Sequence, residues 1–384
     1  MSNGYGVAIA GVGLFPFGRH AGVTVTEMGA TAVRSALSEA GLTRGGFQAA
    51  FCGTVYSGVA AAHKVLSALG MTGMPIIDVE AGCASGGAAL ALGADAIRSG
   101  QYDTVLVFGM EKMPKGVIRS SFFDPWREQA GLSATPAYFA LRAQRLMRET
   151  GLTKEHLASV VVKNRANGAN NPDAMFRAET SIEKVLASRV VCEPLHLHMM
   201  CSPNEGAAAV ILRRADHVRS PGSDIVTVEA AVLRSHLPGA VLGEATPMSG
   251  LTDDTIAAPT TLAARAAFEQ SGLGPADLDV VECQDTDAAR ELLSYEELGL
   301  CASGEQLQWV ESGHTLMTGP LPVNPSGGLL SKGEPLGASA LGQIVELARQ
   351  LRGQAGPRQV TDPQVALGHT VGRGANAAVV ILKR

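Results

Sequence analysis

The first half of the chain alternates between short apolar runs and longer stretches in which apolar residues recur every three or four positions. Strand-like runs occupy residues 6–11, 49–55, 75–79 and 104–109, and helical periodicity marks residues 27–40 and 84–99. Strands alternating with helices are typical of a parallel or mixed sheet covered on both faces. We therefore predict an α/β fold.

The pattern changes between about Met113 and Cys201. Proline, asparagine and aromatic residues are more frequent there, and helical stretches such as residues 138–150 replace the alternation of strands and helices. The sheet pattern resumes at residues 207–212. We interpret the intervening segment as a cap inserted into the first half of the chain.

A second series of alternating elements follows a polar joint at residues 219–224. Strands are predicted at residues 225–233, 278–283, 364–369 and 377–382, and helices at 261–271, 288–298 and 336–352. We predict two comparable halves, residues 1–218 with the cap at about 113–201, and residues 219–384.

Composition excludes several classes of function. The 384 residues carry a net charge of −5, which gives no basic field for nucleic acid. The most apolar stretch, residues 82–97, is interrupted by Asp95, and no signal peptide is recognisable, so we predict no membrane contact. Six cysteines without a C-x-x-C pair indicate reduced thiols and a cytoplasmic protein.

Cys83 lies in the most distinctive local pattern, Gly82-Cys83-Ala84-Ser85-Gly86, where a strand ends and a helix begins. A thiol at a helix start faces unpaired N–H groups and the positive end of the helix dipole, which favours a nucleophilic thiolate. An arbitrary cysteine is more often a small packing residue. Packing does not need a turn lined with small residues, whereas an incoming thioester needs bare backbone.

Two further glycine-rich loops carry candidate side chains. Asn324 opens the first, and Glu334 lies after it, before a helix, where it either faces a cleft or stabilises the helix start. His369 lies between a short strand and a glycine turn. A lone histidine is more often structural, but its position at a strand end suits an acid or base.

These stretches, in this order, resemble the thiolase superfamily, in particular the sterol-carrier-protein type thiolases and their bacterial relatives. The resemblance covers nearly the whole chain and rests on Gly11–Gly18, Gly82–Gly86, Cys201–Ala208 and the loops around Glu334 and His369. It implies two βαβαβαββ halves in a five-layer αβαβα arrangement, a cap over the coenzyme A (CoA) tunnel, and a homodimer formed through sheet edges.

The chain also departs from the family pattern. The family's Gly-His-Pro is Gly333-Glu334-Pro335 here. A second family histidine appears as Gln284 and a possible acid-base cysteine as Thr286, while the usual C-terminal cysteine is His369, as in sterol-carrier-type relatives. The resemblance therefore leaves Cys83, Glu334 and His369 as the predicted catalytic set.

We hypothesise that His369 accepts the proton of Cys83 or of CoA, and that Glu334 orients the histidine. The predicted residues for binding the thioester oxygen or the substrate are Gln284, Asn324, Gly372 and Gly374. No metal is expected. His196, His198 and Cys201 lie close together in sequence, but a closed zinc site needs a fourth ligand, and none lies at a familiar spacing.

Three hypotheses remain open at this stage. The first is a CoA-dependent thiolase acting on a 3-oxoacyl-CoA with a bulky, branched or aromatic acyl group, through an acyl-enzyme on Cys83. The second is an aldolase, lyase or carbon-acyltransferase of the same fold, and the third a catalytically reduced scaffold subunit. CoA is the expected co-substrate, with no tightly bound cofactor. The resemblance also implies a small zinc-ribbon and OB-fold partner protein.

Overall fold

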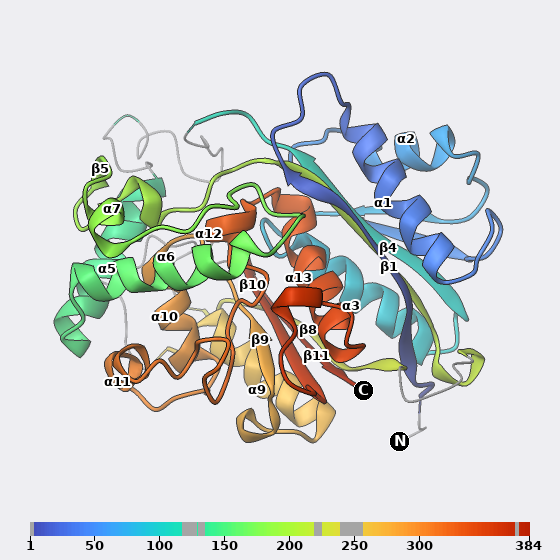
Figure 1. Ribbon diagram of the computed structural model, residues 1–384. Coiled ribbons are helices and arrows are strands. Elements are labelled where there is room, and N and C mark those ends of the chain that lie inside the picture. The colour runs from blue at the N-terminus through green and yellow to red at the C-terminus, as the bar shows by residue number, and fades with distance from the viewer. Residues whose placement is uncertain (1–3, 117–128, 130–134, 219–224, 239–255, 373–375) are drawn as a thin grey trace.

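Nine strands form one continuous sheet, in the order β3-β2-β4-β7-β1-β8-β11-β10-β9. The computed structural model describes residues 4–116, 129, 135–218, 225–238, 256–372 and 376–384 (Figure 1). The strands are β1 (Val7–Gly18), β2 (Ala49–Gly53), β3 (Ile76–Val79), β4 (Thr104–Lys112), β7 (Glu205–Arg214), β8 (Val226–Ser235), β9 (Val280–Glu282), β10 (Val365–Gly372) and β11 (Asn376–Lys383).

The sheet consists of two similar parts joined at β1 and β8. Among the described residues these strands pair at two positions, Ala8 with Thr227 and Ile9 with Val226. In the first part β2 runs parallel to β3 and β4, and β7 is antiparallel to β4 and β1. In the second part β9 runs parallel to β10, and β11 is antiparallel to β10 and β8. A parallel bridge of Val323 to Val281 takes the place that β3 has beside β2.

Helices lie outside both parts of the sheet and between them. Helix α1 (Val25–Glu39) packs on the first part and on α2 (Ala61–Ala68), whereas α9 (Pro259–Ser271) packs on the second part and on α10 (Ala288–Glu297). Helices α3 (Ser85–Arg98) and α13 (Leu336–Leu351) contact each other and strands of both parts (Figure 1). The five-layer αβαβα fold predicted from the resemblance is confirmed.

Both central helices are largely buried, because each contacts the other and strands of both parts of the sheet. Every residue of α13 except Arg349 is buried, and α3 is built mainly from alanine, glycine and leucine. Residues at the ends of these helices are therefore held between the two parts of the sheet.

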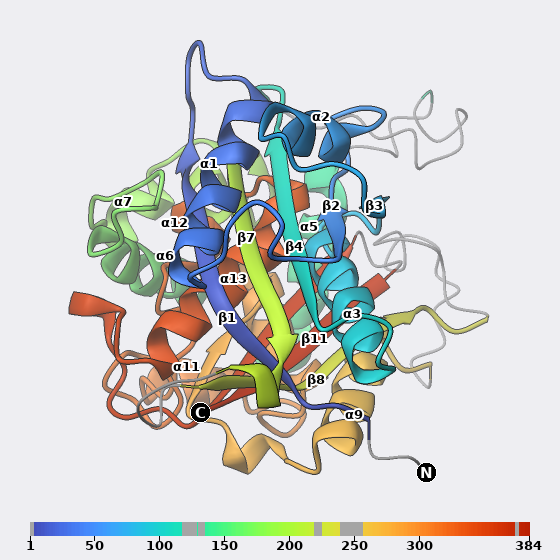
Figure 2. The same cartoon turned by 90° about the vertical axis from the view of Figure 1, so that its right-hand side faces the viewer.

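The cap lies between β4 and β7. It comprises α5 (Thr135–Thr150), α6 (Lys154–Ala169), α7 (Ile182–Leu186), β5 (Val190–Cys192), β6 (Leu195–His196) and the 3₁₀ turn η1 (Leu197–Met199). It packs against α10, α11 (Gln306–Glu311) and α12 (Gly328–Lys332), all of which belong to the second half. Figure 1 shows the cap on the side away from α1 and α2, and Figure 2 shows α6 and α7 beside α12. The cap thus closes over the end of the second half.

Several elements differ from the sequence-based prediction. Strand β1 continues to Gly18, beyond the predicted end at residue 11, and α2, α6 and α7 were not predicted. The proposed boundary at residue 218 adjoins residues 219–224, which lie outside the described residues. Remaining short turns are η2 (Ala215–His217), η3 (Pro275–Asp277) and η4 (Gly356–Arg358). In the described ranges, no helix combines the length and the apolar character needed to cross a membrane.

Candidate active site

Cys83 lies in a tight turn between β3 and the start of α3. Gly82 has a φ of +60°, a left-handed conformation that glycine adopts without strain. The hydroxyl of Ser85 accepts a hydrogen bond from the Ala81 N–H and donates one to the Gly82 carbonyl. These bonds fix the turn, and they hold Cys83, which is 6% exposed, immediately before the helix N-cap Ala84.

Glu334 occupies the same position at the other central helix. Gly333, with a φ of +84°, precedes it, and Glu334 precedes Pro335, the N-cap of α13. Leu336, the first residue of α13, packs in one small apolar cluster with Cys83. The two halves of the fold therefore bring a thiol and a carboxylate together, each one residue before the N-cap of a central helix.

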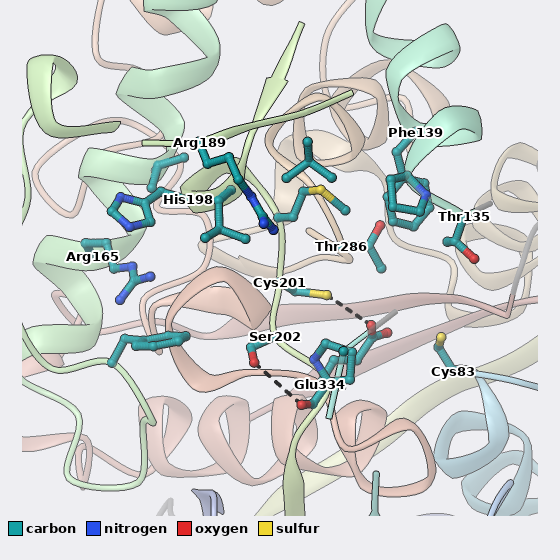
Figure 3. Close-up of a pocket in the computed structure, with 18 of the residues that line it drawn as sticks. Cys83, Thr135, Phe139, Arg165, Arg189, His198, Cys201, Ser202, Thr286 and Glu334 are labelled. Carbon is teal, nitrogen blue, oxygen red and sulfur yellow. Dashed lines mark hydrogen bonds between the residues drawn. The ribbon is translucent and has the colours of Figure 1, made fainter. Parts of the chain in front are cut away.

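Gln284 and Cys201 both donate hydrogen bonds to the Glu334 carboxylate. The amide Nε2 of Gln284 donates to Oε1 at 3.0 Å, and the thiol of Cys201 donates to Oε2 at 3.2 Å (Figure 3). Burial, followed by the adjacent Glu334, raises the pKa of Cys201 well above its usual value. Cys201 is therefore a protonated thiol that donates its hydrogen to the carboxylate.

A cavity of about 650 Å³ opens onto these groups. Cys83, Glu334, Cys201 and Thr286 line it at one end, near Thr135, Tyr138 and Phe139 of α5. Figure 3 shows the sulfur of Cys83 and the carboxylate of Glu334 directed into the same part of this cavity. The volume lies within the range of pockets that bind small organic ligands.

Basic side chains of the cap line the other part of the cavity. Arg165 lies 4.0 Å above the ring of Phe176, and burial lowers its pKa to about 10. Burial and the neighbouring Arg165 lower the pKa of His198, so this imidazole is neutral at pH 7. Arg189 also lines this part (Figure 3). An anionic group would be stabilised here.

The structure does not bring His369 to Cys83. Along β10, Gly368 faces α13 and Gly372 faces the turn before Cys83, so the side chain of His369 points from the opposite face of the strand. Its Nε2 lies 3.0 Å from the hydroxyl of Thr260 on α9. The structure therefore places the ring of His369 against α9 and outside the cavity that Cys83 lines.

His369 is also poorly suited to carry a proton. It is 1% exposed, and burial, followed by Arg290, lowers its pKa well below its ordinary value. It does not line the cavity. Thr370, the next residue, lies on the face of β10 that packs against α3, near Gly87.

Asn324 lies outside the cavity as well. Its Oδ1 accepts the Cys283 N–H at 2.9 Å, and its Nδ2 donates to Glu291 at 2.7 Å. Asn324 is fully buried and adopts a φ of +56°. These contacts occupy the side chain, so the predicted role in binding substrate is not supported, and Asn324 instead joins the chain segment before α12 to α10.

The other predicted binding residues have different positions. Gln284 reaches the site through Glu334, to which it donates. Gly372 packs directly against the carbonyl of Ala81, in the turn that carries Cys83. Gly374 lies outside the described residues. Their roles in holding a thioester oxygen remain predictions.

No metal centre is formed by the described residues, which contain no group of three or more His, Cys, Asp or Glu side chains placed to hold an ion. His196 is buried, with Nδ1 2.8 Å from the Ser188 carbonyl, whereas His198 lies on the following 3₁₀ turn and lines the cavity. The two histidines therefore do not share one strand face.

Cys201 was not among the predicted site residues. In the sequence it was considered as the end of the cap, as part of the family resemblance and as a metal ligand, and its partner Glu334 is 133 residues away. No local spacing reports such a contact. The signal available in the sequence was the turn Cys201-Ser202-Pro203. In the structure Pro203 of this turn forms a parallel bridge with Glu334.

Comparison with known proteins agrees with this geometry. Residues 7–216 match the family model described as the N-terminal domain of thiolase, and residues 244–384 match the thiolase C-terminal domain-like model. The acetyl-CoA acetyltransferase of Methanothermobacter thermautotrophicus is 38% identical over 98% of this chain and 99% of its own length. The benzoylsuccinyl-CoA thiolase subunit BbsB of Thauera aromatica is 37% identical over 97% of this chain and 96% of that subunit.

Sterol carrier protein 2 of Oryctolagus cuniculus is 35% identical over 98% of this chain, which covers 72% of that protein. Among solved structures, the complex named "Ltp2-ChsH2(DUF35) aldolase" superposes with a TM-score of 0.84 at 24% identity, covering 98% of this chain and 97% of that one. Human mitochondrial 3-ketoacyl-CoA thiolase gives 0.72 at 18% identity, covering 99% and 98%. The chain with Cys83 and Glu334 at its two central helix starts therefore belongs to the thiolase family of acyltransferases.

Proposed function

We propose that this protein is a CoA-dependent thiolase that cleaves or forms a 3-oxoacyl-CoA through an acyl-enzyme on Cys83. The observation that carries the proposal is the meeting of Cys83 and Glu334 in one cavity, each just before the N-cap of a central helix. A helix start favours the thiolate, and an adjacent carboxylate can accept the thiol proton. The names of two relatives, an acetyltransferase and a thiolase, agree with this chemistry.

In this mechanism Glu334 replaces His369 as the group that takes the proton of Cys83. The Cys83 thiolate attacks the C3 carbonyl of the 3-oxoacyl-CoA, and backbone N–H groups of the turn before α3 hold the oxygen. Gln284 keeps the carboxylate in place through its 3.0 Å hydrogen bond. Cleavage between C2 and C3 then leaves an acyl group on Cys83, which CoA removes.

We propose a bulky, branched or aromatic acyl group as the substrate, with CoA as co-substrate. The cavity of about 650 Å³ has aromatic walls at Tyr138, Phe139 and Phe176. Arg165 and Arg189 lie in the cap, where they would face the phosphates of CoA. The relative named benzoylsuccinyl-CoA thiolase acts on such an acyl group.

We also propose that the chain works as a homodimer and with a small zinc-ribbon and OB-fold partner. Two names support a second protein, because BbsB is a subunit and one structural neighbour is a complex with a DUF35 protein. The six cysteines form no disulfide with one another, which fits a reducing compartment such as the cytoplasm.

A lyase or carbon-acyltransferase of the same fold is the second candidate. Glu334 favours it, because the family's Gly-His-Pro histidine is replaced and the carboxylate is already hydrogen-bonded to Cys201. A scaffold without catalysis has less support, because it would not need Cys83 beside a cavity. A CoA requirement for carbon–carbon cleavage separates the thiolase from the lyase.

Intact-mass spectrometry tests the proposal. The purified chain, alone and with a small zinc-ribbon protein from the same source, is incubated with a panel of acyl-CoA and 3-oxoacyl-CoA thioesters. We expect an acyl adduct that disappears in Cys83→Ala, persists in Cys301→Ala, and is discharged by free CoA. A wild-type protein that forms no adduct with any thioester would contradict the proposal and favour the lyase.

A further inference from the structure

The aromatic wall of the cavity near Cys83 belongs to helix α5 of the cap. Tyr138 and Phe139 are the aromatic residues of this helix that line the cavity. Arg142 follows them by four and three positions, so it lies on the same face of the helix. Its guanidinium lies 5.1 Å from the centre of the Phe139 ring. What holds Arg142 therefore also holds this wall.

Arg142 forms a buried ion pair with Asp287 of the second half. One terminal nitrogen of the guanidinium meets Oδ2 of Asp287, and the two side chains are 13% and 0% exposed. Salt screens such a pair much less than an ion pair at the surface. Removing one partner leaves a charge in the interior without its counter-charge, which is costly. The pair therefore holds α5 against the second half.

Asp287 is itself fixed by contacts that do not involve α5. It is the N-cap of α10, where its Oδ1 accepts the Arg290 N–H at 3.0 Å. Its backbone forms an antiparallel bridge with Met200, and the preceding carbonyl, of Thr286, accepts the Cys201 N–H at 2.8 Å. Thr286 and Cys201 line the cavity (Figure 3), as does Met200. The ion pair thus joins the aromatic wall to a part of the cavity that is already fixed.

We propose that the ion pair between Arg142 and Asp287 determines specificity, because it holds the aromatic wall of α5 where a bulky acyl group contacts it. The inference rests on the proposed function and names the residues that select the class of acyl group. Neither residue lines the cavity. Both are therefore positioning residues, which act on the substrate through Tyr138 and Phe139.

The size of the acyl group decides how far it depends on this wall. A phenyl ring buries a large apolar area and makes favourable contacts with other aromatic rings, such as those of Tyr138 and Phe139. An acetyl group offers only a methyl group for the same contacts. Movement of α5 away from the second half should therefore weaken binding of the large acyl group and affect the small one little.

Two substrates that undergo the same reaction and differ only in the acyl group test the inference. Acetoacetyl-CoA and 3-oxo-3-phenylpropanoyl-CoA both release acetyl-CoA, and they leave an acetyl or a benzoyl group on Cys83. Rapid quenching and intact-mass spectrometry measure the rate of loading at increasing substrate concentration. Each substrate then gives a half-saturating concentration and a limiting rate.

Three variants separate the charge from the helix cap. Asp287→Asn removes the charge but keeps a side-chain oxygen at the N-cap, a position that asparagine fills as well as aspartate. Arg142→Met removes the cation and keeps a long side chain on α5. The double variant has neither charge. Arg145→Met is the matched control, because it is the same substitution on the same helix and Arg145 pairs with Glu149 of α5 itself.

We expect the half-saturating concentration of 3-oxo-3-phenylpropanoyl-CoA to rise roughly tenfold in each variant that lacks the pair, a coupling common for residues in direct contact. That of acetoacetyl-CoA, and the limiting rates of both substrates, should stay within about threefold on the same scale. The double variant should lose no more than either single variant, because the two residues act as a unit. Arg145→Met should match the wild type.

An equal change for both substrates would overturn the inference, because a general disturbance of the fold does not distinguish between acyl groups. Wild-type values in Asp287→Asn and Arg142→Met would overturn it as well, and so would a wild type that saturates at a lower concentration of acetoacetyl-CoA than of 3-oxo-3-phenylpropanoyl-CoA. Should Asp287→Asn fail to fold, Arg142→Met decides alone, since it leaves the N-cap of α10 intact. A wild type that is loaded by neither substrate would instead contradict the proposed function.

Discussion

At the residue scale, His369 illustrates how burial decides protonation. The imidazole is fully enclosed between β10 and α9, and both burial and the positive charge of Arg290 disfavour its charged form. The unfolded chain exposes the same ring to water, where it titrates at a pKa of about 6.5. At acidic pH the unfolded state therefore binds a proton at His369 that the folded state does not bind.

This difference predicts a pH dependence of stability. Because the folded pKa is lowered, the free energy of unfolding should fall as the pH drops below about 6.5, by up to about 1.4 kcal/mol per pH unit, and reach a plateau above it. Urea denaturation at pH 7.5 and 5.5 should show a smaller loss for His369→Gln than for wild type. Equal losses would argue that the ring is protonated in the fold.

The residues of the site could be predicted from the sequence only in part. Cys83 and Glu334 were recognisable because each follows a glycine at a helix start. The direction of the His369 side chain was not predictable from the sequence. Strand β10 is buried along its whole length, and apolar residues on both faces hide which side chains point to which face. Cys201 was missed because its contact with Glu334 depends on how the cap closes.

At the scale of elements, β10 and the turn before α3 are in direct contact. A Cβ placed on Gly372, the last residue of β10, would lie 1.9 Å from the carbonyl oxygen of Ala81. Only a residue without a side chain allows this approach. The strand end therefore supports the turn that positions the nucleophile.

Replacing Gly372 by alanine should consequently disturb both stability and reactivity. We expect Gly372→Ala to lower the free energy of unfolding by about 1–3 kcal/mol, as for other overpacked sites, and to slow alkylation of Cys83 by iodoacetamide. Thermal denaturation and mass spectrometry measure the two effects. Gly45→Ala is the matched control, because nothing lies within 4 Å of its added Cβ; an equally mild effect at both positions would contradict the packing argument.

Elements were more predictable than side-chain directions. Long periodic segments such as α13 and strand-like runs such as β11 lie within a few residues of their predicted bounds. Short helices were missed, for example α12, whose five residues are held by the carboxylate of Asp285 at the N–H groups of Leu329 and Leu330. Such a helix depends on a distant carboxylate and has no periodicity of its own.

At the scale of the whole molecule, β3 forms an open edge of the sheet. Among the described strands it pairs only with β2, and Ile77 at this edge is 43% exposed. Exposed strand edges are available for pairing with another chain. This edge is therefore where we place the contact in the proposed homodimer.

A charge at the edge should separate the subunits. We expect Ile77→Lys to shift the protein from dimer to monomer in size-exclusion chromatography with light scattering, because two lysines would face each other across the pairing strands. Leu316→Lys is the matched control, since Leu316 is also 43% exposed but follows α11 in the second half. A dimer that survives Ile77→Lys would place the interface elsewhere.

The equivalent positions of Cys83 and Glu334 have a consequence for the origin of the site. If the two halves descend from one duplicated unit, the ancestral pair carried the same residue at both helix starts. Divergence at a single codon would then have created the unequal pair. Each half now supplies one of the two groups, so a half by itself would lack part of the site.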